Sequence, residues 1–361
     1  MEGKQYGIPL FRNMGRVSLV YRKDWLDAGG WTLPVTLEDW YRVIKAGTLG
    51  DPDGNGKPDT YGMMLDKNYN QGTASTLSRF AVSQGAPNKW GVDMEGNFIP
   101  EFAAPEYLET MRLFRRLYAE KLINSDFAVV DASTIDKAYE SGKAAFRLTG
   151  GSAQTIQNQL EKLVPAARVD SAPLKGPGGI RVPGEGGNAG MLVFPKSAVK
   201  SGQELQQILA FLDRLMDPPM VNLLVKGIEG RHYKVAGEFT LPLDKDLDYK
   251  EVKPYRDTFP NRDEQYNMDK PSRDTDLARK SKLIGYENEQ YAIPNPALTL
   301  DSPTYAERGK ELDQQIADAQ TLYIMGKIDD EGWKAEVQRW RSAGGDRVAQ
   351  EYKEAYKRVK K

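Results

Sequence analysis

The sequence contains no cysteine and only one histidine, His232, among its 361 residues. The protein therefore has no thiol nucleophile, disulfide, CxxC redox pair or cysteine-ligated zinc. A Ser-His-Asp triad would depend on His232 alone, and the HExxH zinc motif needs two histidines. Because no second histidine or cysteine can share a metal, we expect His232 to be a packed or hydrogen-bonded loop residue. Hydrolysis by paired carboxylates remains open as an enzymatic chemistry.

The sequence also lacks a surplus of charge and a long apolar run. Lysine and arginine total 50 against 51 aspartates and glutamates, which gives a formal net charge of −1. This balance gives no reason to expect a nucleic-acid partner. No apolar run approaches the roughly 20 residues of a membrane span, and residues 1–5 do not resemble the start of a signal peptide. At roughly 150 residues per domain, the length favours two domains.

Hydrophobic periodicity indicates an α/β protein. Four short apolar runs predict strands, at residues 17–21, 61–65, 144–148 and 191–194. Apolar residues at helical spacing predict helices over residues 107–118, 205–216, 312–323 and 333–340. Thr36 and Asp39 fit a capping box at the start of a further helix. Strands that alternate with helices favour α/β layers over a helical bundle or a β-sandwich.

Residues 51–59 match the template of a calcium-binding loop. Oxygen ligands stand at the first, third, fifth and ninth positions and a backbone carbonyl at the seventh, and glycine occupies the sixth. These ligands are Asp51, Asp53, Asn55, Asp59 and the carbonyl of Lys57. The twelfth position is Gly62 instead of the usual bidentate glutamate, so we expect weak affinity. The motif predicts a structural Ca²⁺, and a turn without an ion is the alternative.

Trp90 is the tryptophan that is hardest to place in a core. The other five lie in or beside predicted helices, where core packing is the default. Trp90 lies among turn residues, in the stretch Pro87–Gly91. It is therefore a candidate to stack on a ligand.

Several stretches together resemble a known family. They are Tyr6–Pro9, Tyr21–Leu26, Pro34–Asp39, Asp51–Gly62, Gly142–Phe146 with Gly150–Ser152, Gly227–Tyr233, and Ile324–Gly326 before Trp333. In order and spacing the chain resembles the bacterial extracellular solute-binding proteins, family 1, in particular the sugar-binding lipoproteins of Gram-positive ABC importers. The resemblance covers nearly the whole chain.

The resemblance implies a two-lobe, periplasmic-binding-protein-like (type II) fold with solute bound in the cleft. Residues 1–15 and 189–290 would then belong to the first lobe. Residues 16–188 and 291–361 would form the second lobe with the C-terminal helices. In relatives a large part of the first lobe and a lipoprotein signal peptide precede Tyr6–Pro9, so the resemblance implies that the first lobe is incomplete here.

The implied function is capture of an oligosaccharide and its delivery to ABC permease subunits. The implied protein is a monomer that is not an enzyme, and it acts as an extracellular, cell-surface lipoprotein whose lipid anchor belongs to the absent N-terminus. A hydrolase or lyase with paired carboxylates is the alternative, and a peptide instead of a sugar is an alternative solute. The resemblance also supports the structural calcium loop, since some oligosaccharide-binding relatives carry one at this place.

The resemblance further implies positions for the solute contacts. Gly15 and Arg16 lie where the first crossing between lobes meets the ligand, and Asn188 marks the second crossing. Asn68 and Tyr69 lie where relatives place polar and aromatic sugar contacts. Gly151 and Ser152 occupy the place where many sugar binders carry a stacking tryptophan. Because a serine stands there, a stacking ring would have to come from Trp90 or Tyr69.

Overall fold

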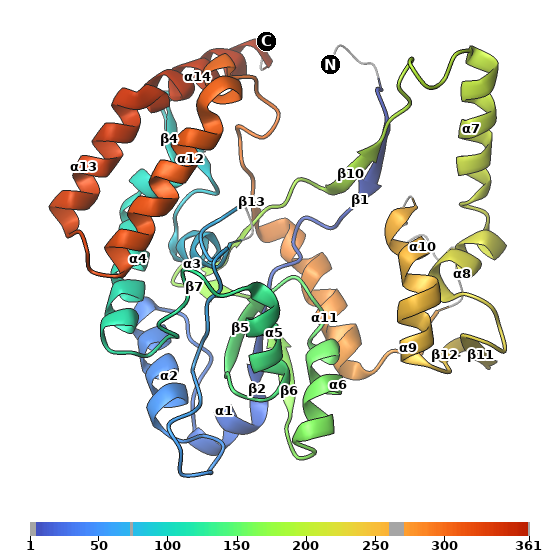
Figure 1. The fold of residues 1–361 in the computed structure, drawn as a ribbon, viewed down its shortest axis with the longest axis horizontal. Coiled ribbons are helices and arrows are strands. Elements are labelled where there is room, and N and C mark those ends of the chain that lie inside the picture. Colours follow the sequence, from blue (N-terminus) through green and yellow to red (C-terminus); the bar gives the residue numbers. More distant parts are fainter. Residues whose placement is uncertain (1–4, 73–74, 260–270, 360–361) are drawn as a thin grey trace. The chain divides into compact units, whose positions relative to one another are not determined.

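The structure is a computed structural model that describes residues 5–72, 75–259 and 271–359 (Figure 1). The chain divides into two compact units, each built from two stretches of sequence. The first unit comprises Met1–Asn13 and Gly186–Thr275, and the second comprises Met14–Glu185 and Asp276–Lys361. Both units combine helices with strands, which confirms the predicted α/β class.

A three-stranded antiparallel sheet lies in the second unit, in the order β5–β2–β6. Its strands are β2 (Ser18–Arg22), β5 (Phe146–Thr149) and β6 (Val169–Ala172). Leu19 of β2 lies opposite Leu148 of β5 and Ala172 of β6, so β2 is paired on both sides. Every residue of β2 is buried. β2 and β5 confirm the strands predicted from the first and third apolar runs.

The strand predicted at residues 61–65 does not form. A single bridge joins Tyr61 to Ala144, and side chains satisfy the backbone further on. Asn124 Oδ1 accepts from Leu65 N at 2.9 Å, and its Nδ2 donates to Leu65 O at 3.0 Å. Because these polar groups are satisfied by a side chain, the segment needs no neighbouring strand.

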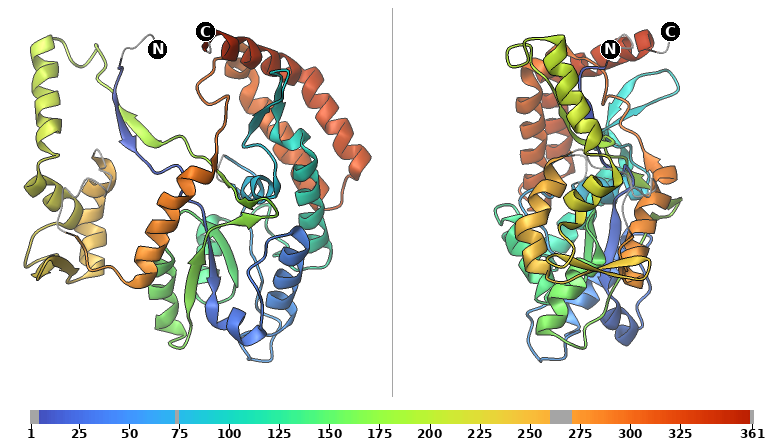
Figure 2. Two further views of the ribbon diagram at one scale, coloured as in Figure 1. Left: turned by 180° about the vertical axis from the view of Figure 1, so that it is seen from behind. Right: turned by 90° about the vertical axis from the view of Figure 1, so that its right-hand side faces the viewer.

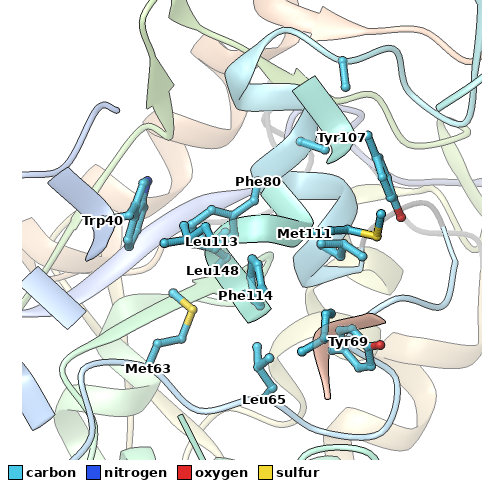
Figure 3. Close-up of a cluster of buried hydrophobic side chains, with 14 of the residues drawn as sticks. Trp40, Met63, Leu65, Tyr69, Phe80, Tyr107, Met111, Leu113, Phe114 and Leu148 are labelled. Atoms are coloured by element: carbon cyan, nitrogen blue, oxygen red, sulfur yellow. The ribbon is translucent and has the colours of Figure 1, made fainter. Parts of the chain in front are cut away.

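Helices enclose the apolar core of the second unit. They are α1 (Lys23–Gly29), α2 (Leu37–Leu49), α3 (Thr76–Gln84), α4 (Pro105–Ala119), α5 (Ala132–Glu140), α6 (Ala153–Leu163) and α11 (Asp276–Glu287). Trp40, Phe80 and Phe114 are fully buried there, and the rings of Phe80 and Phe114 meet edge-on at 5.2 Å (Figure 3). The predicted capping box is confirmed, since Thr36 Oγ1 accepts from Asp39 N and Asp39 Oδ2 accepts from Thr36 N.

Three C-terminal helices complete the second unit (Figure 2). They are α12 (Pro303–Ile324), α13 (Asp330–Trp340) and α14 (Asp346–Val359). A hairpin of β3 (Trp90–Val92) and β4 (Phe98–Pro100) packs on α14. Short elements join these parts: η1 (Glu101–Ala103), β7 (Lys175–Gly176), β8 (Gly179–Ile180), β9 (Val182–Pro183), η4 (Asn288–Tyr291), β13 (Ala292–Ile293) and the π-helical η5 (Arg341–Gly345). β9 and β13 pair in parallel.

The first unit is built from smaller pieces. β1 (Ile8–Phe11) pairs antiparallel with β10 (Asn188–Leu192), and β11 (Tyr233–Ala236) forms a hairpin with β12 (Phe239–Pro242). Its helices are α7 (Gly202–Arg214), α8 (Pro218–Lys226), α9 (Lys245–Leu247), the π-helical η2 (Asp248–Val252) and α10 (Lys253–Thr258). Among all described residues, no helix has both the length and the apolar character needed to cross a membrane.

His232 is a buried, hydrogen-bonded loop residue of the first unit, as predicted. Its Nδ1 accepts a hydrogen bond from Ile228 N at 2.9 Å, and its Nε2 lies 3.0 Å from Glu251 Oε2. The bond to Nδ1 places the proton of the neutral ring on Nε2, which then donates to Glu251. His232 therefore ties the loop before β11 to η2.

The units differ from the predicted lobes most clearly at residues 276–290, which were assigned to the first lobe. These residues belong to the second unit because α11 packs on α6 and β6. Lys280 Nζ lies 2.6 Å from Asp170 Oδ1, and Ala153 N donates to Ser281 Oγ at 3.3 Å. The sequence analysis predicts no helix at residues 276–287, so both α11 and the sheet on which it packs are findings of the structure.

Candidate functional site

The polar site of the second unit begins at the segment that enters β2. Asn288 Nδ2 donates to the carbonyls of Gly15 (3.1 Å) and Val17 (2.7 Å), and Asn288 is buried. A Cβ on Gly15 would lie 2.6 Å from Glu289 N, so only glycine allows this close approach. These contacts fix the backbone on both sides of Arg16.

Arg16 lies against the turn that follows β5. A Cβ added to Gly150 would lie 2.6 Å from Arg16 Nη2 and 3.0 Å from its Nε, so the glycine makes room for the guanidinium group. Glu185 Oε1 is 3.6 Å from Arg16 Nε, which is an ion pair but is too long for a hydrogen bond. Arg16 Nε is buried and has no hydrogen-bond partner among the described residues.

Arg79 of α3 supplies a second guanidinium group, which the sequence reasoning missed. Its Nη1 donates to Leu148 O, at the end of β5, at 2.6 Å. Burial lowers the pKa of Arg79 to about 10, and the nearby charges of Glu185 and Arg16 act on it in opposite directions. Arg79 Nε is also buried without a hydrogen-bond partner in the described ranges.

Arg147 of β5 is a third nearby guanidinium, but its partners are already present. It pairs with Asp136 of α5 and lies 5.2 Å from the ring centre of Tyr139. Its charge lowers the pKa of Arg79 further. Arg16 and Arg79 are therefore the groups of this cluster that retain donors for a ligand.

The remaining predicted site residues of the second unit differ in their hydrogen bonds and exposure. Ser152 caps α6, where its Oγ accepts from Gln154 N at 3.2 Å, and Gly151 N donates to Thr149 Oγ1 at 3.0 Å. Both follow directly after Gly150, which Arg16 contacts. Asn68 is exposed, and its N donates to Asp66 Oδ1 at 2.8 Å. The charge of Asp66 acts to raise the pKa of Arg79.

Tyr69 is a core residue, which corrects the expectation that its ring contacts a sugar (Figure 3). It is 2% exposed, its hydroxyl lies 2.9 Å from Thr321 Oγ1, and its ring meets Phe127 at 5.1 Å. A ring enclosed in this way has no free face for stacking.

Trp90 is also packed against other aromatic residues. It is 9% exposed and lies 5.2 Å from the ring of Tyr352 and 6.2 Å from that of Trp340. What remains accessible of it lines a cavity of about 550 Å³ together with Pro87, Arg181 and other residues of the second unit. Its place among turn residues therefore does not make it an open stacking platform.

Asn188 lies in the first unit, at the start of β10. It is exposed, and its Nδ2 donates to Gly186 O at 3.1 Å. It lies opposite Phe11 of β1. Asn188 is thus a surface residue with an amide oxygen that accepts no hydrogen bond from the described residues.

The predicted calcium loop folds around the amide of Asn55. Asp51 accepts from Asn55 N and Gly56 N, and Asn55 Nδ2 donates to Asp53 Oδ2 at 2.8 Å and to Asp59 Oδ1 at 3.2 Å. The turn requires glycine at position 56, where φ is +74°. Asp53 and Asp59 therefore meet at the side-chain amide of Asn55, whereas Asp51 is occupied by backbone amides of the loop.

A lysine ammonium group already lies beside two of these carboxylates. Lys143 Nζ is 2.6 Å from Asp59 Oδ2 and 3.6 Å from Asp53 Oδ2, and its hydrogen bond lowers the pKa of Asp59. Thr60 donates to Gly47 O, so its hydroxyl points away from the loop. In this arrangement, no group of three or more His, Cys, Asp or Glu side chains in the described parts of the chain could hold a metal ion. The loop thus carries the oxygen donors that calcium prefers, with Lys143 as the cation beside two of them.

Comparison with known proteins gives a consistent answer. No family model matches the chain. It is 35% identical over 369 residues to lipoprotein LipO of Bacillus subtilis, with 100% of this chain and 72% of LipO covered. It is 33% identical, with the same coverage, to the polygalacturonan/rhamnogalacturonan-binding protein YtcQ of Bacillus subtilis.

Solved structures share the fold at lower sequence identity. An HMO-binding, ABC-transporter-associated solute-binding protein from Bifidobacterium longum infantis is 18% identical, with a TM-score of 0.69, and covers 98% of this chain and 77% of its own. The alginate-binding protein AlgQ2, solved without calcium ion, has a TM-score of 0.70 at 18% identity over 99% of this chain and 75% of its own. An EF-hand mutant of the S. pneumoniae substrate-binding protein FusA has a TM-score of 0.67 at 16% identity over 99% and 77%.

These likenesses define a solute-binding protein with the two-lobe, periplasmic-binding-protein-like fold. The chain belongs to the bacterial extracellular solute-binding proteins, family 1. It is a binding protein and not an enzyme, as are the relatives whose names state a function. The alternative of a hydrolase or lyase is therefore set aside.

Proposed function

We propose that this chain captures an oligosaccharide and delivers it to the permease of an ABC importer. The observation that carries this proposal is the 33% identity, over the whole chain, to a protein named for binding polygalacturonan and rhamnogalacturonan. The names of the structural neighbours, which include HMO binding and a complex with kestose, support the same class of solute.

We propose that the second unit contributes polar contacts to this solute. The candidate residues are Gly15, Arg16, Asn68, Gly151 and Ser152, and the first unit would add Asn188. A guanidinium group donates to the hydroxyls of a sugar, and a nearby carboxylate such as Glu185 accepts from them. Because Tyr69 and Trp90 are packed in the core, specificity from this unit would depend on hydrogen bonds more than on stacked rings.

Titration calorimetry of the full-length gene product tests this function. A panel should contain neutral and acidic oligosaccharides, with a tripeptide as the alternative solute. We expect saturable binding of at least one oligosaccharide and none of the peptide. Binding of the peptide alone, or release of reducing ends from polysaccharide, would contradict the proposal. Arg16→Gln should weaken the binding, whereas Arg168→Gln, at an exposed arginine that pairs with Asp27, should not.

The location and partners follow from the same proposal. The relative LipO is named a lipoprotein, which supports a location at the cell surface. We propose further that the protein works as a monomer beside its permease. Protease digestion or antibody labelling of intact cells tests the location. Cross-linking to the permease tests the partner. Signal only after cell lysis would contradict both.

We propose that the loop 51–59 binds one Ca²⁺ in a structural role. Asp51, Asp53, Asn55, the carbonyl of Lys57 and Asp59 would hold the ion, which would neutralise the carboxylates of the loop. The presence of an EF-hand in the neighbour FusA, known from the name of its mutant, supports this proposal. Thermal unfolding with calcium and with EDTA tests it.

A further inference from the structure

Two partly buried guanidinium groups of the second unit have few partners among the described residues. Arg79 makes one hydrogen bond, from Nη1 to Leu148 O, and forms no ion pair with any described carboxylate. Arg16 makes no hydrogen bond to the described residues, and its contact with Glu185 is 3.6 Å long. The Nε atoms of both are buried without a partner. Buried charges are ordinarily paired and hydrogen-bonded, because desolvation without compensation is costly.

The carboxylates near these arginines do not compensate them. Asp136 forms an ion pair with Arg147, and Asp66 accepts a hydrogen bond from the backbone N–H of Asn68. Glu185 is only 13% exposed, yet its carboxylate accepts no hydrogen bond from the described residues. The pair of Arg16 and Glu185 is therefore loose, and Arg79 remains without an anion.

Two glycines keep the turn beside Arg16 free of side chains. Gly150 has no side chain where Arg16 lies, and Gly151 follows it with open space around its Cβ position apart from Thr149 Oγ1 at 3.4 Å. The turn leads into α6, whose first amides are satisfied by Ser152 Oγ and Ser281 Oγ. The amides of Ala153 and Gln154 are thus satisfied within the chain, whereas both arginines keep a buried Nε without a partner in the described ranges.

We propose that Arg16 and Arg79 form a paired guanidinium site that binds the carboxylate of an acidic sugar, so that the solute of this protein is a uronate-containing oligosaccharide. The inference rests on the proposed function and names the class of its substrate. A planar guanidinium fork matches a planar carboxylate and donates two parallel hydrogen bonds to it. A neutral hydroxyl would accept hydrogen bonds but would leave the charge of Arg79 without a counterion.

The test compares one saccharide in two charge states. Trigalacturonate and its fully methyl-esterified form have the same sugar backbone and differ in the charge of their carboxyl groups. In calorimetric titration of the full-length gene product, we expect the acid to bind about tenfold to 100-fold more tightly than the ester, as for hydrogen bonds to charged groups. Arg79→Gln and Arg16→Gln should each reduce or abolish this preference, and Arg168→Gln should preserve it. If Arg79→Gln does not fold, Arg16→Gln carries the test, because its side chain is 34% exposed.

The outcomes separate this inference from the proposed function. If neutral oligosaccharides bind and the acid is not preferred to its ester, this inference is overturned and the proposed function stands. If no saccharide in either charge state binds, the proposed function fails and this inference fails with it. Sodium sulfate serves as a second probe. If sulfate binds in the absence of saccharide, and does so more tightly than trigalacturonate, the assignment to a sugar carboxylate is overturned.

Discussion

The two units of this protein differ in how much apolar surface they bury. In the second unit, aromatic and aliphatic residues from both chain stretches form a continuous core around Trp40, Phe80 and Phe114. In the described part of the first unit, the buried apolar side chains are Leu212, Leu215, Val221 and Val252. Stability from burial scales with the apolar area removed from water, at roughly 25 cal/mol per Å². We therefore expect the first unit to open at lower free energy than the second.

Helix α7 shows the difference most clearly. Its apolar residues recur at helical spacing, and the predicted helix at 205–216 is confirmed. Yet Phe211 is 56% exposed and Leu209 is 39% exposed. Periodicity thus predicts that a helix forms, whereas its burial depends on what the rest of the chain supplies. For the same reason, side chains that hold a ligand in a fixed place are better provided by the second unit.

The chain contains a natural probe for this comparison. All six tryptophans belong to the second unit: Trp25, Trp31, Trp40, Trp90, Trp333 and Trp340. Tryptophan fluorescence therefore reports the unfolding of the second unit alone. Hydrogen exchange of the amides in α7 and α8 reports the first unit.

The largest effect should come from truncating matched leucines in the two cores. Leu117→Ala on α4, at a side chain with no exposure, should destabilise the second unit by about 2–5 kcal/mol because it leaves a cavity. Leu212→Ala on α7, at a residue that is 9% exposed, should cost roughly 1–2 kcal/mol, since its surroundings can collapse. Urea unfolding by fluorescence measures the first cost, and hydrogen exchange measures the second. Equal costs would remove the distinction between the units.

Calcium should act on the second unit alone. At a free concentration about 100-fold above the Kd, one bound ion stabilises by about 2.7 kcal/mol. The transition seen by fluorescence should therefore shift upward with calcium and return with EDTA, while exchange in α7 and α8 stays unchanged. If calcium slowed hydrogen exchange in α7 and α8 but left the fluorescence transition unchanged, the ion would not be bound in the second unit.

The loop also offers a matched pair of lysines. Lys143 Nζ lies beside Asp59 and Asp53, whereas Lys57 is exposed and contributes only its carbonyl to the predicted ligand set. Lys143→Met should tighten calcium binding and destabilise the calcium-free second unit, because it removes the cation that now neutralises the carboxylates. Lys57→Met removes an equal charge, but it should change the calcium affinity and the stability of the calcium-free second unit less than Lys143→Met does. Equal effects of the two variants would show that only net charge matters.

The next prediction concerns acid sensitivity and compares one carboxylate in each unit. In the first unit, hydrogen bonds from Arg231 and His232 lower the pKa of Glu251 to about 2. In the second, burial acts to raise the pKa of Glu351, but hydrogen bonds from Ser302 and Thr304 lower it to about 2. Each contribution is complete above the ordinary value near 4.5 and is lost as the pH falls toward 2.

Because the first unit has the smaller core, acid should affect it more. Between pH 4.5 and 2 we expect the first unit to open before the fluorescence of the second changes, as measured by pulsed hydrogen exchange after acid exposure. Glu251→Gln should make the first unit less stable at neutral pH and remove most of this acid response. Glu351→Gln serves as the control and should leave the acid response of the first unit unchanged. Simultaneous opening of both units would contradict the expectation.

Much of the fold follows from local sequence signals, and much of the site does not. The capping box at Thr36 depends on residues close in sequence, so its geometry could be predicted. Arg79 could not, because α3 brings it to β5 through tertiary packing. The signal that remains in the sequence is Gly150, whose missing side chain makes room for Arg16.

The two aromatic candidates show the converse error. Trp90 was expected to be accessible because it lies among turn residues, and Tyr69 because the family resemblance places a sugar contact there. Each is instead covered by helices from the C-terminal stretch: Thr321 of α12 contacts Tyr69, and Tyr352 of α14 packs on Trp90. A turn fixes the path of the backbone, whereas the burial of its side chains depends on segments more than 200 residues away.

The smallest effect compares two helix caps, Thr36 of α2 and Ser201 of α7. Each side-chain oxygen accepts from the backbone amide three residues on, at 3.1 Å. Removal of such a cap typically costs about 1 kcal/mol. Thr36→Ala should therefore lower the unfolding free energy of the second unit by that amount without local fraying, because α2 is held by the core through Trp40 and Ile44. Ser201→Ala should instead increase hydrogen exchange within the first turn of α7, since tertiary packing does little to hold that helix. Exchange that rises equally at both helix starts would show that the core of the second unit does not protect its helix ends, and the contrast between the units would then be one of total stability alone.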